Sequence, residues 1–322
     1  MSIGNIAGNT AAAPERSAAR GIALKLASVT IFVAMSALIK AASVEVPPGE
    51  AVFFRSLFAV PVICGWLAWR GELRRGLRTV TPMGHVWRGL VGTAAMGFGF
   101  AGLGLLPLSE VQAIQYAAPL LVVIFAAMFL GEEVRAFRLS AVALGLAGVL
   151  VVLSPRLTAL SGGQIDPNEA LGAVVVLASA VCAALAQVFV RRLVSTESVT
   201  AIVFWFSITA TLLSLLTLPF GWAVPSPGAA AMLVAAGLLG GLGQICLTSS
   251  YRHADASVVA PFEYASILFA LAIGYLAFGE VPTRVMLLGV ALVIAAGVLI
   301  IWRERQLGIE RGRARRGMTH HG

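Results

Sequence analysis

Ionisable and amide side chains are rare in the long apolar stretches of this sequence, so the few that occur there are candidates for chemistry. Glu263 lies about seven residues into one such stretch, which corresponds to roughly 10 Å along an α-helix. An ionisable side chain inside a membrane span is costly and is by default a candidate for function. Glu263 is therefore a candidate to bind a proton or a cationic substrate group. The alternative is an ion pair or hydrogen bond that fastens its helix to a neighbour.

The stretch 108–130 carries a row of polar residues on an otherwise apolar surface. Gln112, Gln115 and Tyr116 are spaced i, i+3, i+4, which places them on one face of a helix. An amide that faced lipid would lack a hydrogen-bond partner, so this face is expected to look inward. It would either line a central cavity or form hydrogen bonds that hold helices together.

The remaining candidates are Arg55, Gln187 and Gln244, which also lie within apolar stretches. Arg55 can anchor an anionic substrate. Alternatively, it snorkels to the interface or pairs with a nearby acid such as Glu50. The two glutamines are mid-span amides, and either is a candidate to face the cavity.

The elements that position these residues occur twice in the chain. Gln115 and Tyr116 correspond to Glu263 and Tyr264 at an offset of 148, and the identities extend over both halves. At this offset Ser109, Val111, Tyr116, Ala117, Leu120, Gly131 and Glu132 recur as Ser257, Val259, Tyr264, Ala265, Leu268, Gly279 and Glu280. At an offset of 151, Gly21, Leu26, Ala27 and Ser28 recur as Gly172, Leu177, Ala178 and Ser179. Each copy holds five apolar segments, and an odd number places the second copy upside down in a bilayer.

Composition places these segments in a membrane. Hydrophobic residues make up 59% of the chain and charged residues only 12%, about half the charged share of a soluble domain. The net charge of +8 does not indicate a nucleic-acid partner, because the basic residues flank the apolar segments and form no basic face. The sequence predicts an all-α integral membrane protein with the lipid bilayer as its surroundings.

Ten apolar segments are long enough to cross a hydrocarbon core of about 30 Å. They are 21–42, 50–69, 84–106, 108–130, 136–155, 170–191, 198–220, 228–250, 256–278 and 284–302. The predicted organisation is a disordered tail 1–20, a first five-helix repeat 21–155, a connector 156–169, a second repeat 170–303 and a basic tail 304–322. The two inverted repeats are expected to surround a central cavity.

The basic residues predict the orientation. With the N-terminus in the cytoplasm, cytoplasmic loops and tails hold eighteen Lys or Arg residues, Arg88 among them, whereas the opposite loops hold only Arg156 and Arg284. Both termini are therefore predicted to be cytoplasmic and the connector 156–169 extracytoplasmic. The repeat mates Lys40 and Arg191 then emerge on opposite faces, as inversion requires.

Several other chemistries find no support in the sequence. The chain has no phosphate-binding loop of the Walker type, no His/Asp/Glu cluster of catalytic or metal-binding spacing, and three cysteines that all fall within apolar segments. We therefore predict no enzyme activity, no cofactor and no metal. The oligomeric state is not determined by these patterns.

The chain resembles the drug/metabolite transporter superfamily, in its ten-helix EamA-type branch, over residues 21–303. The resemblance rests on the two five-helix halves and on the segments 50–55, 117–120, 129–132 and 278–280. It implies alternating access about a cavity between the halves, generally without direct use of ATP.

We therefore expect a secondary transporter for a small organic metabolite in a bacterial-type inner membrane, with a proton as a candidate coupling ion. The resemblance of the segment 50–55 to members of this branch implies uptake of a cofactor-type metabolite such as riboflavin or S-adenosylmethionine. Export of amino acids or related metabolites is the alternative. An integral-membrane enzyme acting on lipid-linked substrates, and a channel or structural membrane subunit, are the alternatives from other classes.

Overall fold

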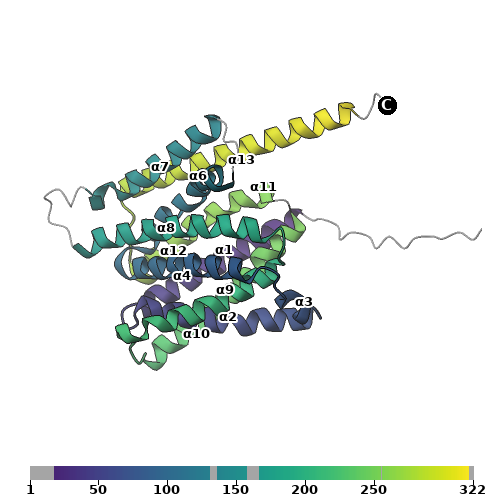
Figure 1. The fold of residues 1–322 in the computed structure, drawn as a ribbon. Helices are drawn as coiled ribbons and strands as arrows, with labels where there is room; N and C mark the ends of the chain where they lie inside the picture. Colours follow the sequence, from purple (N-terminus) through teal and green to yellow (C-terminus); the bar gives the residue numbers. More distant parts are fainter. Residues whose placement is uncertain (1–17, 131–135, 158–166, 255, 319–322) are drawn as a thin grey trace, which may run out of the picture.

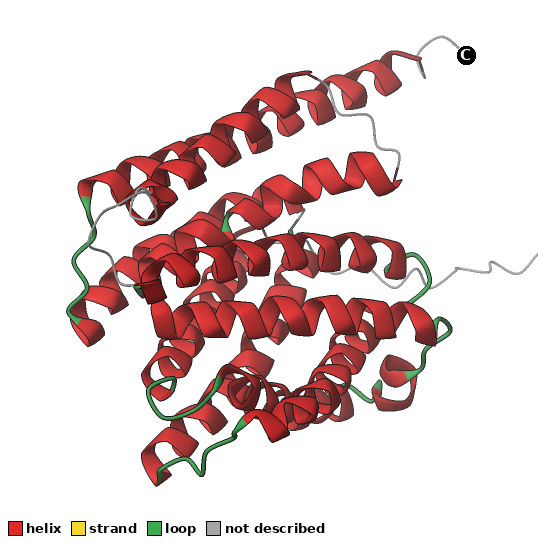
Figure 2. Ribbon diagram, turned by 60° about the vertical axis from the view of Figure 1, so that its left-hand side comes forward, coloured by secondary structure: helices red, strands yellow, loops and turns green. Residues whose placement is uncertain are grey.

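A computed structural model describes residues 18–130, 136–157, 167–254 and 256–318, and every regular element among them is a helix (Figures 1 and 2). The first half contains α1 (Ala18–Ala42), α2 (Pro48–Trp69), α3 (Leu73–Leu77), α4 (Pro82–Leu105), α5 (Leu108–Gln115), α6 (Ala117–Leu130) and α7 (Ala136–Leu157). The second half contains α8 (Pro167–Leu193), α9 (Val199–Ser214), η2 (Leu215–Phe220), α10 (Pro227–His253), α11 (Ala256–Val259), η3 (Ala260–Tyr264), α12 (Ala265–Phe278) and α13 (Arg284–Met318).

Among the described residues, eight helical segments are long and apolar enough to cross a membrane. They cover eight of the ten predicted spans. The other two predicted spans are also helical, as α4 and as α7, whose apolar part is the shorter stretch Leu139–Pro155. Six glycines between Gly89 and Gly104 contribute little hydropathy to α4. The exterior of the bundle is apolar, as a lipid environment requires, with Trp69 and Leu276 largely exposed.

Two predicted spans are interrupted near their middle. The segment 108–130 divides at Tyr116 into α5 and α6, and 256–278 divides into α11, the 3₁₀ turn η3 and α12. Both segments still contain a stretch long and apolar enough to cross a membrane, but each interruption lies beside or at a proline. Pro119 has no N–H for the carbonyl of Gln115, and its ring clashes with that carbonyl. Pro261 likewise lies in η3.

The helices pack in pairs that join the two halves of the chain. α1 lies against α10, α4 against α8, and α7 against α13; the last pair runs along one edge of the bundle in Figure 1. α7 and α13 approach closely at two glycines, where a Cβ on Gly148 would lie 2.8 Å from the carbonyl oxygen of Gly289. Small residues at such crossings let helix backbones come together.

The predicted tails, the connector and the two Gly-Glu pairs can be compared with the described residues. α13 continues to Met318, so the segment predicted as a basic tail from 304 is helical up to that residue. Residues 1–17, most of the connector and the Gly131–Glu132 pair lie outside the described residues. The second Gly-Glu pair is described, and Gly279 ends α12 with a φ of 66°, a left-handed conformation that glycine adopts at low cost.

Substitution of the crossing glycine is expected to destabilise the fold. In Gly289→Ala, the new Cβ would lie 2.7 Å from the carbonyl oxygen of Gly148 and 2.8 Å from the backbone nitrogen of Val152. Because both are backbone atoms, the helices must separate, at a cost of about 1–3 kcal/mol. Thermal unfolding in detergent measures this loss. The control is Gly65→Ala in α2, where a Cβ meets nothing within 4 Å and the gain in helix propensity is up to about 1 kcal/mol. Equal midpoints for the two variants would contradict the close crossing.

Candidate functional site

A cavity of about 1300 Å³ lies inside the helix bundle between segments from both halves of the chain. Its size exceeds the range of about 300–1000 Å³ of typical ligand pockets. Seven of the eight residues predicted from the sequence line it: Gln112, Gln115, Tyr116, Gln187, Gln244, Glu263 and Tyr264. The structure thus brings together side chains that lie up to about 150 residues apart in the chain.

Glu263 forms an ion pair with Lys25 of α1. The Lys25 side chain is 2% exposed, whereas that of Glu263 is 53% exposed and lines the cavity. The ion pair considered as an alternative role for Glu263 is therefore present. The Glu263 carboxylate nevertheless remains accessible from the cavity. The pair therefore joins a buried ammonium group to a carboxylate that a group in the cavity can reach.

The repeat mate of Glu263 makes a neutral contact instead. Gln115 donates a hydrogen bond from Nε2 to Ser179 Oγ (2.7 Å), and Ser179 donates to the carbonyl oxygen of Ala95 (2.6 Å). Ser28, the mate of Ser179 at an offset of 151, donates to the carbonyl oxygen of Gly243 (2.8 Å). Gly243 is 148 residues beyond Ala95. The serine contacts recur at the repeat offsets, whereas the cavity residue differs in charge.

The interruptions of the two helices meet at the cavity. The Tyr116 hydroxyl donates to the backbone carbonyl oxygen of Glu263 (3.1 Å) and also contacts Ser266 Oγ. Ser266 Oγ accepts a further hydrogen bond from Gln112 Nε2 at 3.1 Å. The rings of Tyr116 and Tyr264 lie 5.1 Å apart. Backbone groups freed by the break at η3 are therefore satisfied by side chains of the other half, as an irregular backbone in a membrane requires.

Arg55 does not line this large cavity. It lines a second cavity of about 50 Å³ with Gln244, which lines both cavities, and with Arg88 of α4. The described ion pairs do not include one between Arg55 and Glu50; Glu50 accepts a hydrogen bond from the backbone nitrogen of Ala223. The assignment of Arg88 to a loop was wrong, since it lies in the second turn of α4, with its guanidinium 3.8 Å from the centre of the Phe206 ring.

At one end of the bundle, Lys40 and Glu280 connect the two halves. Lys40 Nζ lies 3.1 Å from Glu280 Oε1 and donates to the carbonyl oxygens of Leu103 (3.1 Å) and Leu106 (2.7 Å). The other carboxylate oxygen of Glu280 accepts from the backbone nitrogen of Leu108 at 2.8 Å. This network, which we call the Lys40 cluster, joins the ends of α1 and α4 to the start of α5 and the end of α12.

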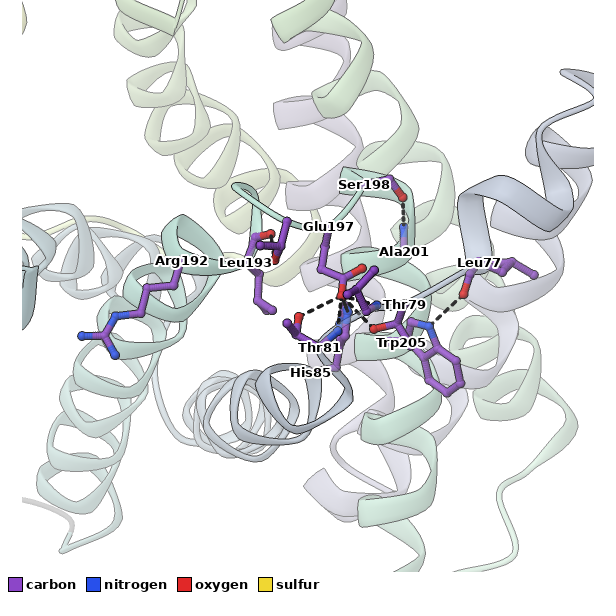
Figure 3. Close-up of polar contacts among 12 residues, drawn as sticks. Leu77, Thr79, Thr81, His85, Arg192, Leu193, Glu197, Ser198, Ala201 and Trp205 are labelled. Carbon is purple, nitrogen blue, oxygen red and sulfur yellow. Dashed lines mark hydrogen bonds and ion pairs between the residues drawn. The ribbon is translucent and has the colours of Figure 1, made fainter.

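At the opposite end, Glu197 holds the connection between α3 and α4 (Figure 3). Its Oε1 accepts four hydrogen bonds of 2.6–2.8 Å, from the hydroxyls of Thr79 and Thr81 and the backbone nitrogens of Val80 and Thr81. Burial by itself raises the pKa of the Glu197 carboxyl, but the hydrogen bonds outweigh this effect and lower it to about 2. His85 Nε2 lies 3.6 Å from the same oxygen. Glu197 therefore remains ionised with no exposed side-chain surface.

Sequence reasoning did not find Lys25, Arg88, Ser179 or Glu197 as partners in these sites. Lys25 carried a signal, because it is a charge inside a predicted span. Ser179 carried one as well, because it belongs to the repeat. Glu197 had none, since an acid in a polar turn is ordinary. Within the described ranges, no group of three or more His, Cys, Asp or Glu side chains is placed to hold a metal ion.

Comparison with models of known protein families shows to which family this chain belongs. The model of the EamA-like transporter family matches the chain twice, over residues 19–154 and 170–302. The chain belongs to the EamA-like transporter family. It is a multi-pass membrane protein, and a second model, for solute carrier family 35, matches residues 107–220.

Curated relatives of this EamA-like transporter carry different small molecules. It is 32% identical over 282 residues to the pseudopaline exporter CntI of Pseudomonas aeruginosa, covering 87% of this chain and 93% of that one. It is 28% identical to the riboflavin transporter of Rhizobium johnstonii, over 80% and 82% of the two chains. It is 26% identical to the S-adenosylmethionine uptake transporter of Rickettsia felis, over 80% and 84%.

The fold is also similar to that of a protein with a known crystal structure. A crystal structure that is 23% identical in sequence superposes with a TM-score of 0.63, covering 90% of this chain and 99% of the other. This similarity concerns the fold. The family match and the curated relatives support transport of a small metabolite across a membrane.

Loss of the Glu197 charge is expected to destabilise the protein in a pH-dependent way. Because hydrogen bonds lower the pKa from 4.5 to about 2, the ionised carboxylate stabilises the folded protein above pH 4.5. This contribution is lost as the pH falls through the interval toward 2. Glu197→Gln should therefore unfold at lower temperature than the natural protein at pH 7, and the difference should shrink below pH 4.5.

Thermal unfolding of both proteins between pH 7 and pH 3.5 measures this difference. The control is Glu72→Gln, which removes a partly exposed ion pair with Arg70 (2.9 Å) and should cost no more than about 1 kcal/mol. A difference for Glu197→Gln that does not vary with pH would contradict the role of the charge.

Proposed function

We propose that this protein is a secondary carrier that moves a small organic metabolite across the inner membrane by alternating access. The observation that carries the proposal is the large cavity, lined by polar side chains of both halves where two helices are interrupted. Interrupted helices at a repeat interface are the common construction of substrate sites in secondary transporters. Such a site binds polar groups of the substrate in the place of water.

The proposed architecture is ten transmembrane helices in two inverted five-helix repeats around this cavity. Three observations support it. The family model matches two successive stretches of similar length. The packing of α1 on α10 has its counterpart in the packing of α4 on α8. The hydrogen bonds of Ser28 and Ser179 are related by the repeat offsets.

The proposed orientation places both termini in the cytoplasm. Without Arg88, the predicted cytoplasmic loops and tails still hold most of the basic residues. In this orientation the residues that line the cavity at its cytoplasmic end include Glu72, Gly76, Val194 and residues 198–200. The opposite turns 43–47, 106–107, 215–226 and 279–283 contribute no lining residue. With the proposed orientation, this cavity supports an inward-facing state of the carrier.

The Lys40 cluster closes the opposite end in this state. It joins helices of both halves through one ion pair and three hydrogen bonds to the backbone. Opening toward the outside requires these contacts to separate. A carrier of this kind changes state when substrate or a coupling ion changes the relative stability of the two closed ends.

Glu263 is the proposed coupling site. Its carboxylate is accessible from the cavity while it pairs with the buried Lys25. A proton, or a cationic group of the substrate, that binds to Glu263 competes with Lys25 for the same charge. Since Lys25 is on α1 and Glu263 is on η3, this competition acts directly on a contact between the two halves.

Substrate and direction are part of the proposal. The relatives include an exporter and two transporters for cofactor-type metabolites. Uptake of riboflavin or S-adenosylmethionine is the first reaction to test, and export of pseudopaline or an amino acid is the alternative. The aperture of the cavity supports neither direction over the other, because an alternating-access carrier uses both states in each cycle.

Counterflow in proteoliposomes tests the carrier function. Vesicles loaded with an unlabelled candidate should accumulate the labelled form at least tenfold faster than protein-free vesicles. For the substrate that is carried, Glu263→Gln should abolish the dependence of the rate on pH. The control is Glu72→Gln, which alters a carboxylate at the cytoplasmic end of the same cavity and should keep the dependence. Unchanged rate and pH profile in Glu263→Gln would rule out its role in coupling.

Loss of the Lys40 cluster should open the other end. In intact cells, Gln187→Cys in a background without the natural cysteines should resist a membrane-impermeant thiol reagent, because position 187 faces a cavity that reaches only the cytoplasmic end. Adding Lys40→Met should make this cysteine reactive from outside, by about tenfold or more in labelling rate. Val194→Cys, at the cytoplasmic end of the cavity, is the control and should stay unlabelled from outside in both backgrounds. Labelling of Val194→Cys from outside would reverse the proposed orientation.

A further inference from the structure

Two arginines from different helices meet beside the main cavity. Arg55 of α2 and Arg88 of α4 line the same small cavity of about 50 Å³. Two like charges at short range repel, and the repulsion is strong where water is scarce. Such an arrangement lowers the stability of the folded protein unless an anion compensates the two charges.

The described protein supplies no compensating anion there. The other residues lining this small cavity are Ala59, Ile63, Val203, Phe206, Ser207, Gly240 and Gln244, and none is a carboxylate. Nε of Arg55 and both Nε and Nη1 of Arg88 are shielded from solvent and have no hydrogen-bond partner. By contrast, Lys25, Lys40 and Glu197 each have partners. Buried unsatisfied donors on a charged group are costly.

The aromatic contact of Arg88 does not satisfy these donors. Its guanidinium lies 3.8 Å from the centre of the Phe206 ring, and this contact stabilises the cation. The N–H bonds of a guanidinium lie in its plane and require acceptors. They remain available for a ligand.

Two glycines make room for both side chains, Gly240 on the neighbouring helix α10 and Gly92 one turn beyond Arg88 on α4 itself. A Cβ on Gly240 would lie 3.1 Å from Arg55 Nε, and a Cβ on Gly92 would overlap Arg88 Nη1. Larger residues at these positions would displace the guanidinium groups. The surrounding helices thus accommodate two cations that the protein itself leaves uncompensated.

We propose that Arg55 and Arg88 bind an oxyanion of the transported substrate, a carboxylate or a phosphate group. The planar donor fork of arginine matches the two oxygens of such a group. A volume of about 50 Å³ exceeds the share of one water molecule, about 30 Å³, and fits a single anionic group. Gln244 lines both cavities, so the body of the substrate would occupy the large cavity and its anionic end the small one.

This inference rests on the proposed carrier function and narrows its substrate class. S-adenosylmethionine carries a carboxylate that fits the site, whereas riboflavin has no anionic group at neutral pH. The inference therefore favours an anionic or zwitterionic metabolite. It also assigns Arg55 and Arg88 to substrate binding and leaves coupling to Glu263.

Anion titrations of the purified protein in detergent test the site without knowledge of the substrate. Chloride is replaced stepwise by acetate or phosphate at constant ionic strength, and thermal unfolding is followed. An anion that binds the folded protein raises its midpoint, here by about 2 °C or more. Arg55→Gln and Arg88→Gln should abolish this rise. Both variants should also unfold at higher temperature than the natural protein in chloride, because an uncompensated charge has been removed.

The controls separate this role from a structural one. Arg70→Gln removes an exposed arginine paired with Glu72 and should keep the full response. Arg88→Lys retains the charge without the planar fork and should weaken acetate binding about tenfold. If an arginine variant does not fold, Gly240→Ala keeps both charges, crowds Arg55 Nε and should reduce the response.

Each contrary outcome overturns the inference. The first is an unfolding midpoint of the natural protein that does not respond to acetate or phosphate. The second is a response that survives both arginine substitutions. The third is a natural protein that is more stable in chloride than in acetate or phosphate, which would indicate a halide site. The counterflow assay is independent of this titration. A carrier that shows counterflow but no anion response would retain the proposed function and lose the oxyanion site.

Discussion

The cost of removing an ionised group from water governs the interior of this protein. Charges that enter the bundle are stabilised only by partners that compensate them. Lys25 pairs with Glu263, Lys40 with Glu280, and Glu197 with four hydrogen-bond donors. Each of these contacts connects segments that are distant in the chain. At these three positions, the contact between the two halves of the bundle is also the contact that compensates a charge.

The same constraint applies to the backbone at the interrupted helices. A break within a membrane leaves carbonyl groups without N–H partners, and such groups are tolerated only beside polar side chains or a cavity. The Tyr116 hydroxyl serves the carbonyl of Glu263 across the repeat interface. The prolines that break the helices, the tyrosine that satisfies them and the cavity that they line form one arrangement.

Three charged sites of the proposed carrier differ in how completely their charges are compensated, and this difference separates their roles. The Lys40 cluster is fully satisfied and closes one end. The Lys25–Glu263 pair is satisfied but exposed on its acidic side, so it can be exchanged. Arg55 and Arg88 are unsatisfied at three buried nitrogens, so they favour a ligand that brings negative charge. A closed end, a coupling site and a binding site thus differ in how completely their charges are compensated.

The sequence by itself determined the elements and the inner faces of this protein. Composition and length placed all ten segments that are helical here, and seven of the eight candidate residues predicted from polar positions in these segments line one cavity. This succeeded because a polar residue in an apolar helix has few alternatives to facing inward. The helix breaks at Tyr116 and η3 were missed, although Pro119 and Pro261 were visible, because prolines are also tolerated within membrane helices. Only the tertiary structure decided which charges meet: Lys25 with Glu263, Glu197 with the 79–81 turn, and Arg55 with Arg88. Those meetings depend on how helices distant in sequence cross and rotate against each other, and periodicity along a single helix carries no information about its neighbour.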